Sequence, residues 1–114
     1  MDMIRFVAYL RPHRLEAAKT AIAALGITGM TVADARGCGN SEERSRWLEG
    51  EEAVVALPIR SRLEVVAPAE LAEALIAATS EAVRTGEAGD GKIFIFPVED
   101  VLRIRTGERG EAAL

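Results

Sequence analysis

A short glycine-rich segment that ends in a lysine carries residue types that suit anion binding. In TGEAGDGKIF, Gly86, Gly89 and Gly91 precede Lys92 at the start of a predicted strand. Glycines let backbone amide groups approach an anion closely, and the lysine ammonium adds a compact positive charge, which together fit a phosphate group. The segment is neither a Walker loop nor a dinucleotide-binding fingerprint, because no strand directly precedes it and no helix follows it. On spacing alone, a plain connecting loop is at least as good an interpretation.

Two arginines near the C-terminus are the second candidate for phosphate chemistry. Arg103 and Arg105, in RIRTGERG, lie two residues apart in a predicted extended segment, so both would project to one face and could grip a diphosphate. The alternative is that both are solvated surface side chains, which is the usual state of an arginine.

Residue types that act as nucleophiles, bases or soft metal ligands are scarce. Cys38 is the only cysteine and His13 the only histidine, too few for a structural zinc site or a disulfide framework. We interpret Cys38 as a packing residue and His13 as a surface or capping residue. No catalytic residue and no metal site is predicted. Trp47 lies among charged residues, where it would anchor a partner or pack onto its own oligomer.

Patterns of apolar residues predict the elements that position these groups. Alternating and β-branched stretches predict strands, and apolar residues at helical spacing, with Gly26 after the first helix and Pro68 opening the second, predict two helices. The predicted strands cover residues 3–10, 29–36, 53–66 and 92–96, the helices residues 14–25 and 68–84, and a last extended segment residues 101–105.

The stretch after the second strand differs in character from the rest. Its sequence, GCGNSEERSRWLEGEE, contains three glycines and dense charges of both signs, without a periodic apolar face to pack on a core. We expect an exposed, partner-binding loop over about residues 37–58.

The order of elements is that of an α+β, ferredoxin-like βαββαβ fold with a short C-terminal strand. We expect one domain over residues 1–114. Helices that cover one face of the sheet leave apolar strand positions on the other, so self-association into a homo-oligomer is expected.

Composition excludes several classes of function. The net charge of −4 and pI near 5.1 argue against nucleic-acid binding, although a few cations still suffice for a small anion. The longest apolar stretches, residues 21–27 and 93–98, are far shorter than the roughly 20 residues of a membrane helix. The start, MDMIRF, shows no secretory signal, and we expect a cytoplasmic location.

Three segments together, TGEAGDGKIF, RIRTGERGEAAL and GITGMTVADARGCG, resemble the PII nitrogen-regulatory family in order and spacing, and the similarity covers essentially the whole chain. The resemblance implies a homotrimer that is not an enzyme. Each of its three clefts between subunits would bind ADP, AMP or ATP, and a mobile loop would regulate a partner such as a transporter, channel or enzyme.

The same resemblance implies a set of binding residues. Arg60 matches a family lysine near the nucleotide and keeps its charge with a different geometry. Gly37, Cys38 and Gly39 would border the phosphates at the base of the loop. By the family pattern, the phosphates are held by Gly89, Asp90, Gly91, Lys92, Arg103 and Arg105, and the adenine and ribose by Gly29, Met30, Thr31, Glu64 and Val66.

The chain departs from the family pattern in its long loop. Ser41 aligns with the glutamine that helps to hold magnesium and 2-oxoglutarate, and Ala53 aligns with the tyrosine that is uridylylated, which excludes that modification at this position. Sensing of 2-oxoglutarate is therefore in doubt. A second effector would involve Gly39, Asn40, Ser41 and Arg60, with bicarbonate as a candidate because carboxysome-associated PII-like proteins sense it.

Two other functions compete with this interpretation. A slow nucleotide hydrolase would use Asp90 as a water-activating group, although the family uses that residue in a backbone turn. A structural or metal-tolerance trimer would share the fold but lack the phosphate motifs.

Overall fold

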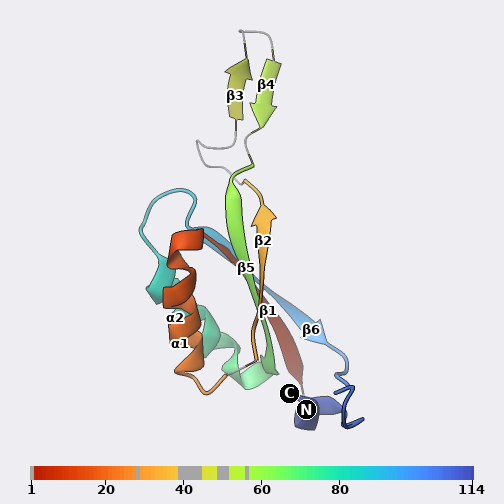
Figure 1. The fold of residues 1–114 in the computed structure, drawn as a ribbon. Coiled ribbons are helices and arrows are strands. Elements are labelled where there is room, and N and C mark those ends of the chain that lie inside the picture. The colour runs from red at the N-terminus through yellow and green to blue at the C-terminus, as the bar shows by residue number, and fades with distance from the viewer. Residues whose placement is uncertain (1, 28, 39–44, 49–51, 56) are drawn as a thin grey trace.

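A four-stranded antiparallel sheet with two helices on one face forms the body of the protein (Figure 1). The computed structural model describes residues 2–27, 29–38, 45–48, 52–55 and 57–114. Neighbouring strands follow the order β2-β5-β1-β6. Their bounds are Met3–Leu10 for β1, Thr31–Arg36 for β2, Ile59–Pro68 for β5 and Gly91–Val98 for β6. Helix α1 spans Leu15–Ala23 and α2 spans Ala72–Val83. The predicted βαββαβ plan is confirmed.

Short 3₁₀ turns lead into both helices and close the chain. Proline starts or precedes the first two of them, since its fixed φ suits the first helical turn and its missing N–H is not needed there. They are η1 at Pro12–Arg14, η3 at Ala69–Leu71 and η4 at Gly110–Ala113.

The core lies between the helices and one face of the sheet. Leu63 and Val65 of β5 are buried, as their alternation with Arg62 and Glu64 predicts. They pack with side chains of β1 and of both helices. The largest fully buried side chains in this core are Phe6, Leu10, Ile22, Leu63 and Leu75.

The opposite face of the sheet has no helix over it. Val7 is buried there, but its cross-strand partner Phe94 is 45% exposed and Phe96 is 42% exposed. The Arg5 guanidinium lies 5.2 Å from the centre of the Phe96 ring, and Tyr9 packs edge-on against Phe94. This open face therefore presents large aromatic side chains.

A separate hairpin interrupts the segment that was expected to be an irregular loop. Strands β3, Ser45–Leu48, and β4, Glu52–Val55, pair only with each other, and Figure 1 shows them projecting beyond the ends of β2 and β5. Two strands can satisfy each other's backbone hydrogen bonds without a core, which charge patterning alone does not reveal.

The expected extended segment over residues 101–105 was wrong. The backbone instead reverses: Gly107 N donates to Arg103 O at 2.8 Å, Arg103 N donates to Glu108 O at 2.9 Å, and Leu102 forms an isolated bridge with Arg109. Gly107 has a φ of +75°, which glycine adopts readily and which allows this tight turn. None of the helices in the described residues is long and apolar enough to cross a membrane.

Candidate phosphate-binding site

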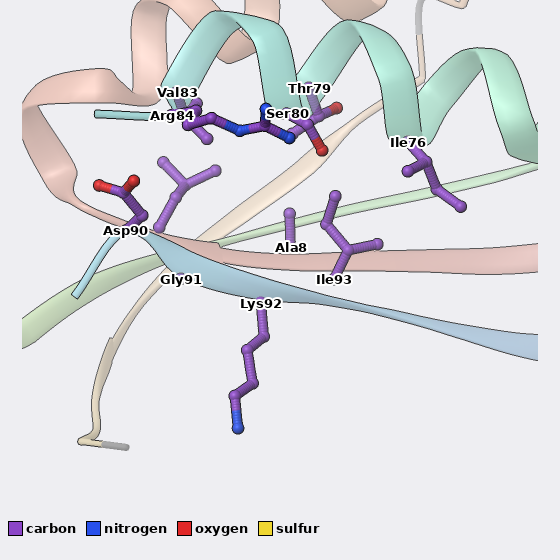
Figure 2. Close-up of a pocket in the computed structure, with 11 residues that line it drawn as sticks. Ala8, Ile76, Thr79, Ser80, Val83, Arg84, Asp90, Gly91, Lys92 and Ile93 are labelled. Carbon is purple, nitrogen blue, oxygen red and sulfur yellow. The ribbon is translucent and has the colours of Figure 1, made fainter. Parts of the chain in front are cut away.

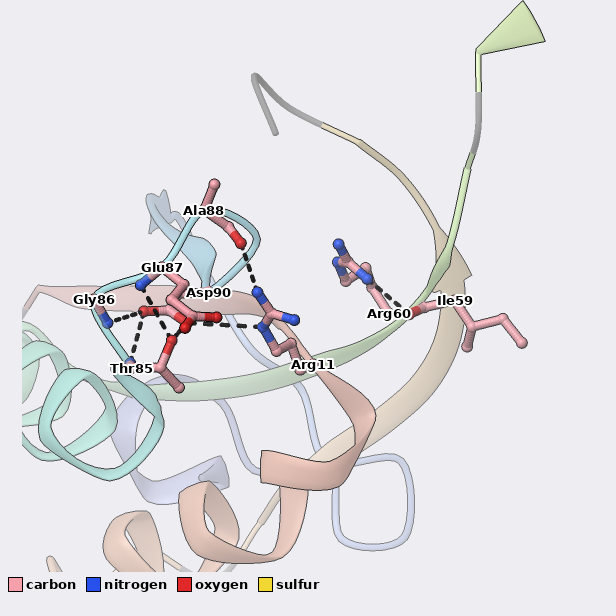
Figure 3. Close-up of polar contacts among 8 residues, drawn as sticks. All are labelled: Arg11, Ile59, Arg60, Thr85, Gly86, Glu87, Ala88 and Asp90. Atoms are coloured by element: carbon pink, nitrogen blue, oxygen red, sulfur yellow. Dashed lines mark hydrogen bonds and ion pairs between the residues drawn. The ribbon is translucent and has the colours of Figure 1, made fainter. Parts of the chain in front are cut away.

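The glycine-rich segment is folded around the carboxylate of Asp90 (Figure 3). Thr85 donates to it through its backbone N–H at 2.7 Å and its hydroxyl at 2.5 Å, and Gly86 N–H donates at 2.9 Å. Glu87 N–H in turn donates to the Thr85 hydroxyl at 3.2 Å. The loop from residue 85 to 91, called the phosphate loop below, is thus organised from within.

These contacts set the charge of the central carboxylate. The hydrogen bond from the Thr85 hydroxyl, then those from the backbone N–H groups and the nearby Arg11 charge, lower the pKa of Asp90 below its ordinary value. Asp90 is therefore ionised at neutral pH, and its oxygens are occupied by loop donors. This arrangement gives Asp90 the structural role of a turn residue.

The phosphate loop meets the sheet at Gly91, where only glycine fits. Its φ is +118°, and a Cβ on this residue would lie 1.8 Å from the carbonyl oxygen of Tyr9. The Gly91 backbone therefore lies directly against β1, and the loop cannot slide along that strand.

Lys92 projects from the open face of the sheet. It pairs with Tyr9 in the β1–β6 register, is exposed, and has no acidic partner within the described chain. Figure 2 shows its side chain pointing away from a cavity of about 330 Å³ that lies between α2 and the sheet. Polar side chains of Thr79, Ser80 and Arg84 line that cavity together with aliphatic ones, and the Lys92 ammonium points away from it.

Three of the predicted adenine-side residues, Thr31, Glu64 and Val66, lie on the same open face, whereas Met30 packs against the buried core cluster. Thr31 is the cross-strand partner of Glu64, and Val66 follows Glu64 on the same face of β5. The Glu64 carboxylate already accepts Arg5 Nη2 at 2.6 Å and lies 3.3 Å from Arg62 Nε. A ribose hydroxyl that donates to Glu64 would therefore use an acceptor position of the carboxylate that Arg5 and Arg62 leave unoccupied.

The base of the long loop lies at the same end of the sheet as the phosphate loop. Leu10 pairs with both Gly91 and Ser61, and Ser61 pairs with Asp34, which places the four strands in one row there. Gly37 N–H donates to Pro58 O at 3.1 Å and closes the loop base. Among the other predicted residues, Gly29, Met30, Cys38 and Arg60 are described, whereas Gly39, Asn40 and Ser41 lie outside the described residues.

Within one chain, Arg103 and Arg105 lie far from the phosphate loop. The path along β6 from Lys92 to Val98 is about 20 Å at roughly 3.3 Å per residue, and the chain after β6 stays at the end of the sheet where both termini lie (Figure 1). Arg103 donates to Leu114 O at 2.9 Å and to Glu108 Oε1 at 3.2 Å, which fixes the C-terminal turn. Arg105 lies in the turn itself and is exposed, so the extended backbone from which the shared face of the two arginines was predicted is not present.

Arg11 is a residue of the site that the sequence reasoning missed. Its Nη2 donates to Ala88 O at 2.5 Å, and its Nε lies 3.7 Å from Asp90 Oδ1. The position of Arg11 at the end of the first strand offered one clue. A strand that begins after the glycine-rich segment and pairs antiparallel with the first strand must begin next to Arg11. Thr85 was missed for a simpler reason, because a hydroxyl that caps a loop has no distinctive spacing.

No group of three or more histidine, cysteine, aspartate or glutamate side chains is placed to hold a metal ion in the described parts of the chain.

An antiparallel ferredoxin-like domain with a separate hairpin and a glycine-rich loop organised around Asp90 is the class of protein that this fold defines. The family model named nitrogen regulatory protein P-II matches residues 1–108. The chain belongs to the nitrogen regulatory protein P-II family, as its motifs predicted.

Individual relatives match over nearly the full length. A nitrogen regulatory protein P-II of Azospirillum brasilense is 41% identical over 112 residues, which cover 98% of this chain and all of that protein. Arabidopsis thaliana PII bound to citrate is 38% identical, with a TM-score of 0.81 over 99% of this chain and 92% of the other. A complex of Bacillus subtilis GlnK with ATP is 28% identical, with a TM-score of 0.80 over 99% and 96%.

These relatives decide between the classes of function considered from the sequence. Members of the family are regulatory signalling proteins, so the prediction that the chain is a regulator and not an enzyme is confirmed. Family membership also separates the chain from metal-tolerance proteins. The carboxysome-associated subtype stays a prediction.

Proposed function

We propose that this protein senses adenine nucleotides in clefts between its own copies and passes the signal to a partner protein through the β3–β4 hairpin. The observation that carries the proposal is the separation of the two cationic groups. Lys92 and Arg105 lie toward opposite ends of β6, so a phosphate held by both requires a second copy of the chain. A homotrimer with three such clefts satisfies this requirement and covers the aromatic open face.

The nucleotide phosphates would meet the phosphate loop and Lys92 of one copy and the C-terminal arginines of its neighbour. The ATP complex of the Bacillus subtilis relative supports ATP, and we include ADP and AMP because the same cradle accepts fewer phosphates. The proposed nucleotide contacts are Gly29, Met30, Thr31, Gly37, Cys38, Gly39, Arg60, Glu64, Val66, Gly89, Asp90, Gly91, Lys92, Arg103 and Arg105.

The shared position of the phosphate loop and the loop base supplies the route for signalling. Both emerge from the end of the sheet marked by Leu10, Ser61 and Gly91, so a ligand held there touches residues that lead into the hairpin. The ligand shifts the hairpin only by the difference in its affinity for two hairpin states. The partner would be a cytoplasmic enzyme or the cytoplasmic side of a transporter or channel.

The second effector would be a small anion near Arg60 and the loop base. Citrate in the Arabidopsis relative supports small carboxylates as ligands within this family, and bicarbonate remains our candidate for this chain. We place the regulation in carbon or nitrogen metabolism, without uridylylation at Ala53.

Replacing Lys92 with alanine tests the proposal. Loss of a charge-assisted hydrogen bond weakens ADP binding by about 1.5 to 3 kcal/mol, and Arg103→Ala and Arg105→Ala act similarly. Isothermal titration calorimetry measures the change. Lys19→Ala is the matched control, because Lys19 lies on α1 and its ammonium pairs with Glu16 at 3.1 Å, away from the phosphate loop. Equal ADP affinity in all four variants and the parent protein contradicts the proposed cradle.

A further inference from the structure

The backbone N–H groups of the phosphate loop divide into used and unused donors. Those of Thr85, Gly86 and Glu87 are bound to Asp90 or to the Thr85 hydroxyl. Those of Ala88 and Gly89 donate to no acceptor in the described part of the chain. The loop thus holds its first three amides internally and leaves the next two for a ligand.

The Arg11 contact bears directly on one of these two amides. Ala88 C=O and Gly89 N–H belong to the same peptide plane, and the chain has no cis peptide bond. In a trans peptide the C=O and N–H groups point in opposite directions. When Ala88 O accepts the Arg11 hydrogen bond at 2.5 Å, the Gly89 N–H must point away from Arg11.

Gly89 needs such an anchor because its own backbone restrains it weakly. Its φ is +97°, in a region that glycine leaves easily, so its preceding peptide plane can rotate at little cost. Arg11 itself is held more firmly. It follows the last β1–β5 pair, Leu10 with Ser61, precedes Pro12, and its side chain is only 22% exposed.

We propose that Arg11 is a positioning residue for nucleotide binding, which fixes the Ala88–Gly89 peptide so that the Gly89 N–H is presented to a nucleotide phosphate. The ion pair with Asp90 holds the guanidinium in place for this hydrogen bond. The inference rests on the proposed nucleotide site and adds to it a residue that acts through the backbone (Figure 3).

The test compares Arg11→Gln and Arg11→Lys with Arg14→Gln. Arg14 is the matched control, because it lies three residues away and makes no hydrogen bond to the phosphate loop. ADP affinity is measured by calorimetry, and hydrogen exchange of the Gly89 amide by NMR in the nucleotide-free protein. The unfolding midpoint and the mass of the assembly show whether each variant is folded.

We expect Arg11→Gln to weaken ADP binding about tenfold, the size of one lost hydrogen bond, and to change Gly89 exchange before any nucleotide is added. Arg11→Lys keeps the positive charge and a longer donor side chain than the short, neutral glutamine amide, so it should recover part of both effects, and it covers the case in which Arg11→Gln fails to fold. Arg14→Gln should change neither quantity.

The remaining outcomes count against the inference in distinguishable ways. Weaker ADP binding with unchanged Gly89 exchange means that Arg11 contacts the phosphate directly, which overturns the positioning role. Unchanged ADP binding in Arg11→Gln, alongside weakened binding in Lys92→Ala, overturns the inference and leaves the nucleotide site in place. Unchanged binding in both variants removes the nucleotide site itself.

Discussion

Gly91 connects the phosphate loop to the sheet through a backbone contact that excludes every side chain. Asp90, one residue earlier, holds the loop together through Thr85 and Gly86. Adjacent residues thus have separate tasks, because glycine allows the close approach to Tyr9 and the carboxylate binds the loop amides. Lys92 follows with an exposed side chain that can contact a ligand.

Replacing Gly91 with alanine should therefore disrupt both the fold and the site. The new Cβ would lie 1.8 Å from Tyr9 O at a φ of +118°, so backbone strain and overpacking act together and cost about 2 to 4 kcal/mol of unfolding free energy. Urea denaturation measures the loss. Gly26→Ala is the control, since Gly26 has a φ of +87° but open space around it, and should cost about 1 kcal/mol. Equal losses of unfolding free energy in Gly91→Ala and Gly26→Ala would contradict the predicted clash with Tyr9 O.

Acid should loosen the phosphate loop through Asp90. A carboxyl whose pKa is lowered in the folded protein contributes stability above its unfolded value, here 3.8, and that contribution disappears as the pH falls through the folded value. We expect hydrogen exchange of the Thr85 and Gly86 amides to quicken relative to the intrinsic rate below about pH 4. In Asp90→Asn that extra pH dependence should vanish, whereas Asp100→Asn should leave it in place, because Asp100 binds Arg109 in the C-terminal turn.

At the scale of the elements, sequence periodicity was sufficient wherever a strand or helix packs on the core. The alternation of Leu63 and Val65 and the helical spacing of Ala18 and Ile22 both depend on burial, and both matched the structure. The single strand predicted over 53–66 was wrong, because β4 ends at Val55 in the hairpin and β5 begins at Ile59 in the main sheet. The β3–β4 hairpin and the C-terminal turn did not follow from pattern, because backbone pairing and a positive φ at Gly107 decide them. Arg11 was not predicted for a related reason. Its hydrogen bond to Ala88 joins the end of β1 to the loop before β6, and residue spacing within one element does not reveal such a contact.

The loop that contains the hairpin carries the prediction about 2-oxoglutarate. Ser41 aligns with the family glutamine that completes a magnesium site beside ATP, and its hydroxyl is two heavy atoms too short to replace the amide oxygen. We expect 2-oxoglutarate not to strengthen Mg-ATP binding, and ADP or AMP to compete well with ATP. Calorimetry of Mg-ATP with and without millimolar 2-oxoglutarate measures this, with Ser41→Gln as the variant expected to gain the effect. A tenfold gain in affinity in the parent protein would mean that the loop has rebuilt the site.

At the scale of the whole molecule, two exposed features call for a neighbouring copy. Phe94 and Phe96 lie on the open sheet face, and Ile104 is 92% exposed on the C-terminal turn between the two arginines. Covering apolar surface of this size stabilises association, and closed symmetry limits it to a defined number of copies.

We expect a homotrimer in solution. Light scattering should give three times the 12.2 kDa mass of one chain at micromolar concentration, with or without ADP. Phe94→Glu should lower that mass, because it places a charge on the open sheet face, whereas Glu73→Gln at an exposed position of α2 should not. A stable monomer of the parent protein would remove the composite nucleotide cleft.

The separate pairing of β3 with β4 has a consequence for how this protein can diverge from its relatives. Because the two strands pair with each other and with no strand of the main sheet, changes in the sequence of residues 45–55 leave the register of the other four strands intact. Under the proposed function, selection on these residues would come from the partner protein and not from the packing of the main sheet. A duplicated gene could therefore acquire a new target by altering one short hairpin while it inherits the same sensor unchanged.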